Sequence, residues 1–155
     1  NEPPFILLLD HIQDPHNLGS LLRSAEGAGV HGVVIPVDRA AAVTPAAARV
    51  SAGAAEHIKV ARVVNVVQVM RKLKEDGVWM TGLEAVEDAR EYADADLKGP
   101  LGIVVGGEES GLSRIALETC DFLVKLPQKG MVTSLNAAVA GAIILYEACR
   151  QRVKK

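Results

Sequence analysis

The sequence predicts an α/β domain in which helices cover both faces of an open, mostly parallel sheet of six strands. Six short apolar runs, rich in β-branched residues, alternate along the chain with segments of helical periodicity. The runs are continuously apolar, which is typical of parallel strands buried on both faces. Because 155 residues suffice for one hydrophobic core, we expect residues 1–155 to form a single domain.

The strands are recognised by their apolar, β-branched composition and by the loop residues that follow most of them. They are expected at residues 5–9, 31–36, 57–60, 78–82, 101–105 and 122–126. Alternation of this kind indicates right-handed crossovers through the intervening helices. The order of the strands in the sheet does not follow from the sequence.

The helices have recognisable starts, where a side-chain oxygen accepts from free backbone N–H groups. Proline after Thr44 suits the first helical position, and Gly77 suits a helix end. We expect Asn17 to cap a helix with the apolar face Leu18, Leu21, Leu22 and Ala25, Thr44 to cap a helix from Pro45, Asn65 to cap 66–75, Ser113 to cap a helix to Thr119, and a last helix over about 134–152.

The last helix is apolar nearly all round, which predicts burial on more than one side. Either the domain covers both sides or a second subunit covers one of them, and in a chain of this size we favour a homodimer interface. One face consists of Leu135, Ala138, Val139, Ala142, Ile143 and Tyr146, and the other apolar residues are Ala140, Ile144, Leu145 and Ala148.

The composition is that of a globular protein, with 49% hydrophobic and 23% charged residues. Seventeen Lys and Arg face nineteen Asp and Glu, which gives a net charge of −2. Small autonomous nucleic-acid binders usually carry a basic surplus or stacking aromatics, and this chain has neither. No apolar run has the length of a membrane span, no signal peptide is recognised, and the two cysteines indicate a reducing compartment. We therefore expect a cytoplasmic protein.

Ligands of open α/β sheets bind at the carboxyl ends of strands, and three loops there have unusual sequences. The first, over residues 10–23, has turn residues at 14–17 and an arginine, Arg23, off the apolar face of the following helix. Arg23 can therefore reach the loop region. Two interpretations stay open: Asn17 and Arg23 belong to a site, or they are a helix cap and a solvated charge.

The second loop, over residues 102–113, ends a strand in Gly106-Gly107 and continues with Glu108-Glu109. It has neither the lysine of a P-loop nor the G-x-G-x-x-G spacing. Its carboxylates would repel a phosphate. The loop therefore predicts close backbone approach to an uncharged or cationic ligand near Glu108. The alternative is a tight turn with exposed carboxylates.

The third loop, over residues 126–136, is broken by Pro127 and Gly130 and ends in Thr133, Ser134 and Asn136, at the start of the last helix. One capping residue would suffice. Three polar residues therefore predict that this helix start also faces a ligand, and the alternative is redundant capping.

A metal site is not expected. His11 and His16 are five residues apart, which does not place them on one helical face, and no cysteine or third histidine is spaced to complete a site.

The three loops share one resemblance. The residues that carry it are Asn17-Leu18-Gly19-Ser20 with Arg23-Ser24-Ala25, then Val105-Gly106-Gly107-Glu108 with Gly111-Leu112-Ser113, then Leu126-Pro127, Gly130 and Ser134-Leu135-Asn136-Ala137. In this order they resemble the three motifs of the SpoU/TrmH family of RNA ribose 2′-O-methyltransferases, in the SPOUT superfamily. The resemblance covers residues 5–152. The stretches DPHNLG, LRSAEGAGVHGVVIP and YEACRQR are most similar to the bacterial enzymes that methylate a guanosine of 23S ribosomal RNA.

The resemblance implies features that periodicity does not show. They are a deep C-terminal trefoil knot, S-adenosylmethionine (S-adenosyl-L-methionine) bound in the knot mainly by backbone groups, RNA as substrate, and a homodimer with a shared active site. By position, the cofactor contacts would fall on Thr81, Gly82, Gly106, Leu126 and Leu135.

The resemblance also implies catalytic roles. The residue that matches Arg23 is the family's proposed proton-handling group. Arginine keeps its proton at neutral pH, so Arg23 would equally well hold the phosphate beside the ribose or stabilise a developing alkoxide. Asn17, Glu108, Ser134 and Asn136 would position Arg23, the target nucleotide or the methionine end of the cofactor.

Two alternatives to a ribosomal RNA enzyme remain. One is a tRNA 2′-O-methyltransferase, and the other is a non-catalytic RNA-binding or ribosome-assembly module with the same fold. The enzymes that the chain resembles usually carry a small N-terminal RNA-binding domain, which we do not expect within these residues. Electrostatic capture of RNA would then depend on local groups such as Arg23, Arg39, Arg49, Lys129 and the basic tail over residues 150–155.

Overall fold

The computed structural model describes residues 2–132 and 134–153. They form one sheet of seven strands in the order β3-β2-β1-β6-β4-β7-β5, and every neighbouring pair is parallel. The strands are β1 (Phe5–Asp10), β2 (Gly32–Pro36), β3 (Lys59–Val63), β4 (Trp79–Leu83), β5 (Arg90–Glu91), β6 (Leu101–Gly106) and β7 (Phe122–Lys125).

The six predicted strands are confirmed, but the predicted number of strands is wrong because the sheet has a seventh, β5. This strand has only two residues, Arg90 and Glu91, and both are exposed and charged. It pairs with the end of β7 at the edge of the sheet. Without an apolar run, β5 has no sequence signal of the kind that identified the others.

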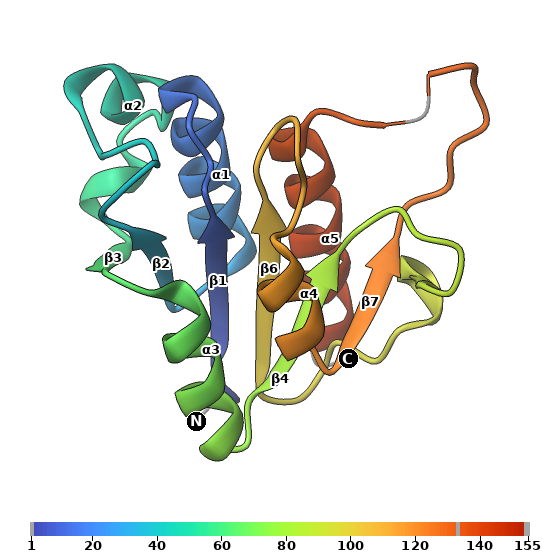
Figure 1. Cartoon of the computed structure of the whole chain (residues 1–155). Coiled ribbons are helices and arrows are strands. Elements are labelled where there is room, and N and C mark those ends of the chain that lie inside the picture. The colour runs from blue at the N-terminus through green and yellow to red at the C-terminus, as the bar shows by residue number, and fades with distance from the viewer. Residues whose placement is uncertain (1, 133, 154–155) are drawn as a thin grey trace.

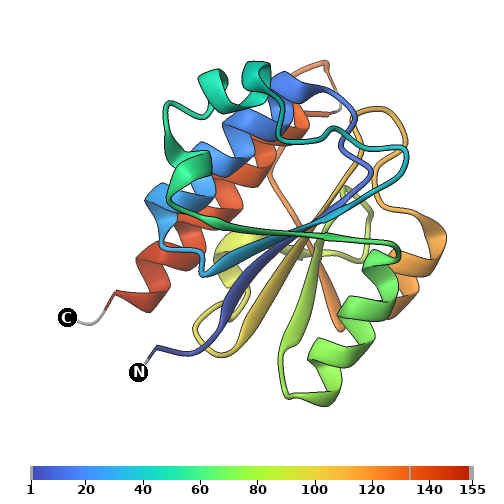
Figure 2. The same cartoon turned by 90° about the vertical axis from the view of Figure 1, so that its left-hand side faces the viewer.

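Helices cover both faces of the sheet, as predicted. Helices α1 and α5 pack on one face, and α3 and α4 cover the other (Figures 1 and 2). The helices are α1 (Pro15–Ala28), α2 (Pro45–Val50), α3 (Val66–Glu75), α4 (Arg114–Thr119) and α5 (Ala137–Arg152), with 3-10 turns η1 (Ala54–Glu56) and η2 (Tyr92–Asp94). None of the helices in residues 2–132 and 134–153 has the length and apolar character that a membrane crossing requires.

The predicted caps Thr44, Asn65 and Ser113 are confirmed, and each accepts a hydrogen bond from the first turn of its helix. Two predicted helix starts are wrong. Helix α1 begins at Pro15 and is capped by Asp14, and α5 begins three residues later than expected, with Asn136 as its cap. Proline suits the first helical position because its φ is fixed and it has no N–H to leave unpaired. Asn17 is therefore inside the helix, where its side chain is free for other contacts.

Helix α5 is covered on one side only within a single chain. Its buried residues lie against α1 and the sheet, and Gly141 allows Leu21 to pack against the helix backbone. The apolar side chains of Val139 and Ile143 remain 49% and 37% exposed. Within residues 2–132 and 134–153, the domain therefore does not bury the side of α5 that carries Val139 and Ile143.

The central strands β1 and β6 direct their following segments to opposite faces of the sheet. They pair along their whole length, from Phe5 with Leu101 to Asp10 with Gly106. The chain after β1 continues into α1 on one face, and the chain after β6 continues into α4 on the other (Figure 2). A crevice forms at such a divergence, and in open α/β sheets it is where ligands bind.

The end of β6 tolerates no side chain. A Cβ built on Gly106 lies 2.1 Å from the carbonyl carbon of Gly111 and 2.3 Å from the backbone nitrogen of Leu112. We expect Gly106→Ala to lower the free energy of unfolding by about 3 kcal/mol, because backbone cannot move aside as a flexible side chain does. Urea denaturation measures this change. Gly99→Ala is the control, because a Cβ there meets no atom within 4 Å, and a similar loss in both variants would contradict the prediction.

Candidate active site

The first component of the site is a hydrogen-bonded chain that joins the three loops identified in the sequence. Glu108 Oε1, after β6, accepts from the backbone N–H groups of Gln13 and Asp14 and from Asn17 Nδ2, each at 3.2 Å. Asn17 Oδ1 accepts from Asn136 Nδ2 at 3.2 Å. Three of the predicted catalytic residues, Asn17, Glu108 and Asn136, therefore lie together.

Asn136 connects this chain to the start of α5. Its Oδ1 accepts from the backbone N–H groups of Ala138 at 2.9 Å and Val139 at 3.2 Å. The side chain therefore serves as a helix cap with its oxygen and holds Asn17 with its nitrogen. The capping interpretation of Asn136 is thereby confirmed, and its contact with Asn17 joins the first and third loops.

The environment of Glu108 stabilises its ionised form. Partial burial on its own would raise the pKa of the carboxyl group. Hydrogen bonds from its own backbone N–H and that of Asp14, from the Asn17 amide and from the backbone N–H of Gln13 outweigh burial, and the pKa is lowered. The ionised carboxylate of Glu108, which can only accept hydrogen bonds, therefore lies where the three loops meet.

Two further carboxylates hold the loop over residues 106–113, which we call the glycine loop. Asp10, only 3% exposed, accepts from the backbone N–H of Ser113 at 2.7 Å. Glu84 accepts from the backbone N–H of Leu112 at 3.0 Å. Our sequence interpretation missed both residues. The one available signal was a single acidic residue at the end of a buried strand, or just after one.

The second component of the site is a pocket of about 190 Å³ beside this hydrogen-bonded chain. The ends of β4, β6 and β7 and the start of α5 line it. Five predicted site residues are among its lining: Gly106, Glu108, Leu126, Ser134 and Leu135. Its charged side chains are the carboxylates of Glu84, Glu108 and Glu109 and the ammonium group of Lys125.

Two predicted cofactor-binding residues do not line this pocket. Thr81 is completely buried in β4, and its hydroxyl has no hydrogen-bond partner among residues 2–132 and 134–153. Gly82 faces the opposite side of the sheet, where a Cβ would meet Leu112, Cys120 and Leu123. The residues of this strand end that do line the pocket are Leu83 and Glu84.

Arg23 stands apart from the hydrogen-bonded chain. It is exposed on α1, six residues after Asn17, which is about 9 Å along a helix. No hydrogen bond or ion pair within the described part of the chain links Arg23 to Asn17, Glu108 or Asn136. Ser134 is exposed at the pocket, and Thr133, the third polar residue of the predicted cluster, lies outside the described residues.

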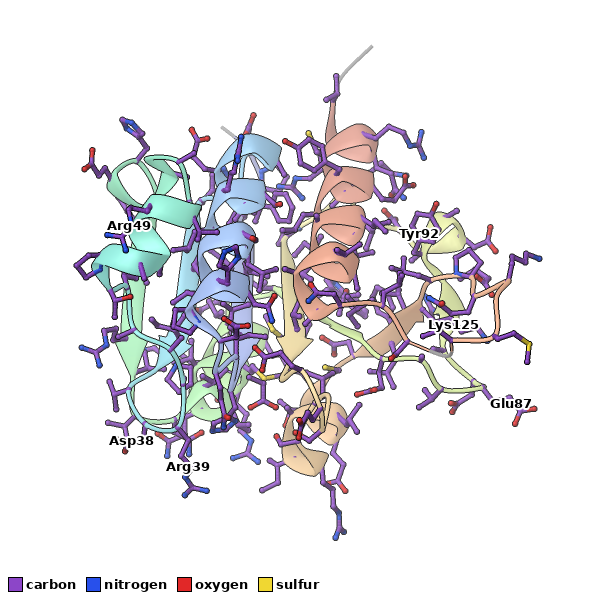
Figure 3. The ribbon with its side chains drawn as sticks, turned by 90° about the horizontal axis from the view of Figure 1, so that it is seen from above. Asp38, Arg39, Arg49, Glu87, Tyr92 and Lys125 are labelled. Atoms are coloured by element: carbon purple, nitrogen blue, oxygen red, sulfur yellow. The ribbon has the colours of Figure 1, made fainter. Side chains whose placement is uncertain are left out.

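Arg39, Arg49 and Lys129, which are also expected to attract RNA, are exposed but dispersed. Figure 3 shows Arg39 and Arg49 on the side of the molecule that holds α2. Lys129 follows β7 in the chain, and Lys125, which was not among the predicted groups, lies on the side opposite α2 in the same view. Lys125 donates to the backbone carbonyl of Glu87 at 3.1 Å. No cluster of three or more His, Cys, Asp and Glu side chains with the arrangement of a metal site occurs in residues 2–132 and 134–153.

The family model described as the SpoU rRNA Methylase family matches residues 4–146. The chain belongs to this family. Among its relatives is the 23S rRNA (guanosine-2′-O-)-methyltransferase RlmB of Shewanella oneidensis, 48% identical over 149 residues, which cover 96% of this chain and 60% of RlmB. The chain spans about 60% of the length of the curated relatives it matches.

Solved structures of SpoU proteins have the same fold. The SpoU methyltransferase AviRb from Streptomyces viridochromogenes, in complex with the cofactor AdoMet, superposes with a TM-score of 0.89 at 33% identity, over 97% of this chain and 61% of AviRb. The A. aeolicus TrmH/SpoU tRNA modifying enzyme superposes with a TM-score of 0.89 at 27% identity, over 97% of this chain and 76% of that enzyme. The family model and these structures confirm the predicted SpoU/TrmH family.

Glu108 makes the site sensitive to acid. Because folding lowers the pKa of its carboxyl group, its hydrogen bonds stabilise the protein above the ordinary value of 4.5. That stability is lost as the pH falls through the lowered pKa.

We expect Glu108→Gln to lower the free energy of unfolding by about 1 kcal/mol at neutral pH, a value limited by solvent screening. Denaturation at several pH values should show this difference from the unmodified protein shrink as the pH falls below 4.5 and vanish once the pH is below the lowered pKa of Glu108. Glu109→Gln is the control, and a constant difference for Glu108→Gln would refute the role of its charge.

Proposed function

We propose that residues 1–155 form the catalytic domain of an RNA ribose 2′-O-methyltransferase that uses S-adenosylmethionine and acts on a guanosine of 23S ribosomal RNA. The observation that carries this proposal is the hydrogen-bonded chain from Glu108 through Asn17 to Asn136. It joins the three loops whose motifs define the resemblance, at the edge of a pocket. The similarity to RlmB supports ribosomal RNA as the substrate.

The pocket has the chemistry expected for S-adenosylmethionine. Three carboxylates against one ammonium group favour a ligand that carries positive charge. Gly106 has no side chain to block close approach, and Leu126 and Leu135 contribute apolar surface. When bound, S-adenosylmethionine supplies the methyl group from its sulfonium centre to the ribose hydroxyl. In this proposal the backbone of Gly106, Leu126 and Leu135 holds the cofactor, and Thr81 and Gly82 shape the strand beside it.

The side chains of the site then align the ribose and help to remove its proton. Backbone N–H groups hold Glu108 in its ionised form and in a fixed position. The hydrogen bond between Asn136 and Asn17 holds the third loop against the first. Ser134 would donate to the cofactor or the nucleotide. Arg23 would bind the phosphate next to the target ribose and stabilise the charge that develops on the hydroxyl oxygen.

Two further features belong to this proposal. In this proposal the C-terminal segment forms the trefoil knot that the resemblance to the SPOUT superfamily implies. The enzyme works in the cytoplasm, where ribosomal RNA is modified in bacteria.

The similarity to a tRNA modifying enzyme favours tRNA as the second candidate substrate.

A strain that lacks the gene tests the function. We expect nucleoside mass spectrometry to show the loss of one 2′-O-methylguanosine from 23S ribosomal RNA, restored by the unmodified gene and not by Arg23→Ala. Calorimetry should give the Arg23→Ala protein near-normal affinity for S-adenosylmethionine, because Arg23 acts on the RNA. A loss from tRNA instead would select the second substrate. No lost nucleoside together with no cofactor binding would indicate a non-catalytic RNA-binding or ribosome-assembly module.

We also propose that the protein is a homodimer in which α5 supplies the interface and the active site is shared. Val139, Ile143 and Tyr146 form an exposed apolar face on α5, at the spacing of one side of a helix. A second copy that covers them would explain why the helix is apolar on both sides. It would also give Arg23 a route to a site, since Arg23 does not join the hydrogen-bonded chain within one protomer.

Sedimentation velocity tests this interface. We expect Ile143→Glu to convert the dimer into monomers, because two carboxylates would be buried without partners across a symmetric contact. Trp79→Glu, which alters an even more exposed apolar residue on β4, should leave the dimer intact. Dimers that persist in the Ile143→Glu protein would place the interface elsewhere.

A further inference from the structure

A second cavity, of about 740 Å³, lies outside the active-site pocket. The carboxyl ends of β1, β2 and β3 and the starts of α3 and α4 surround it, and we call it the β1–α3 cavity. Its lining residues come from the end of β1 and from the segments around α3 and α4, the two helices that cover this face of the sheet (Figure 2). Its volume is within the usual range of small-ligand sites.

His11, in the lining of this cavity, has an unusual backbone conformation. Its φ is +66°, in the left-handed region that glycine adopts without strain and other residues adopt at a cost. Residues held in such strained conformations cluster at functional sites, where the strain is part of how the site works. At His11 the side chain is an imidazole at the mouth of a cavity.

A buried carboxylate fixes this imidazole. His11 Nδ1 lies 2.8 Å from Asp10 Oδ1, and the other oxygen of Asp10 accepts from the backbone N–H of Ser113. Because an ionised carboxylate only accepts, Nδ1 donates to it. Nε2 accepts no hydrogen bond from residues 2–132 and 134–153 and is left to pair with a ligand. The imidazole is thus oriented by a group that is itself held by the glycine loop.

The remaining lining suits a flat, partly apolar ligand. Val64 and Ile115 are 85% and 53% exposed, and they contribute apolar surface from the segment after β3 and from α4. Arg114 is exposed beside them, in a surface ion pair with Glu118. Such pairs are weak, so a phosphate can replace Glu118 as the partner of Arg114. A nucleobase between apolar side chains, with a phosphate at the rim, matches this combination.

The glycine loop separates the cavity from the active-site pocket. Gly107 lines the active-site pocket, and a Cβ built on it would lie 2.8 Å from the carbonyl oxygen of His11. Ser113, at the other end of the loop, lines the β1–α3 cavity. Only the glycine loop therefore lies between a ligand in the cavity and a ribose placed at Glu108.

We propose that the β1–α3 cavity binds a nucleobase of the RNA substrate that flanks the methylated nucleotide, with His11 as a specificity-determining residue. This inference rests on the proposed function, because it assigns the cavity to the same RNA. His11 pairs through Nε2 with the polar edge of the base, and Arg114 binds its phosphate.

The test uses His11→Gly, which removes the imidazole and relieves the backbone strain at the same time. NMR of the ¹⁵N-labelled chain is titrated with the dinucleotide GpU and with free 5′-GMP and 5′-UMP. We expect GpU to shift the amide signals of His11, Asn65 and Ser113, and His11→Gly to weaken its binding about fivefold, the equivalent of one hydrogen bond.

Ala52→Gly is the matched control. Ala52 is a second non-glycine residue in the left-handed region, with φ +54°, and it does not line the cavity. Its replacement should raise the melting temperature and leave GpU binding unchanged. The inference is overturned if His11→Gly binds GpU as well as the unmodified chain, or if free mononucleotides bind and GpU does not.

Calorimetry with S-adenosylmethionine separates this inference from the proposed function. Cofactor binding without GpU shifts at the cavity would overturn the inference and leave the proposed function intact. GpU shifts at His11 without any cofactor binding would overturn the methyltransferase and leave a nucleotide site.

Discussion

The carboxylate of Glu108 holds together segments that are far apart in the sequence. Its partners Gln13, Asp14 and Asn17 are 91 to 95 residues away, and the pair of Asn17 with Asn136 spans a further 119 residues. The loops after β1, β6 and β7 meet through these contacts. Hydrogen bonds to a charged acceptor are stronger than neutral ones, so the rim of the pocket depends on one group that must stay ionised.

The parallel strands were predictable because burial on both faces leaves a continuous apolar run, as in residues 5–9 and 101–105. The start of α1 was not. Asp14 and Asn17 are both good caps three residues apart, and local propensity does not choose between them. The choice is made by Pro15, which favours the first helical turn, and by Glu108 and Asn136, which bind the Asn17 side chain. Asn17, which looks like a helix cap in the sequence, therefore uses its side chain in the candidate site instead.

Asp10 and Glu84 were missed for a related reason. Each is a single carboxylate at or just after the end of a buried strand, and neither belongs to a local pattern. Their partners are the backbone N–H groups of Ser113 and Leu112, which are 103 and 28 residues away. Both carboxylates hold the far end of the glycine loop, while Glu108 holds its middle. Motif spacing identified the candidate site residues, and only the folded chain shows the residues that fix the loop.

The glycine loop is a thin partition because its backbone packs directly against other backbone. A side chain on Gly106 would displace Gly111, and one on Gly107 would displace the carbonyl of His11. The same few atoms therefore form part of both the active-site pocket and the support of the β1–α3 cavity. A ligand on either side that moves this backbone changes the shape offered to the other side. Because such coupling is reciprocal, a flanking base that improves cofactor binding must itself bind more tightly, by the same factor, when the cofactor is present.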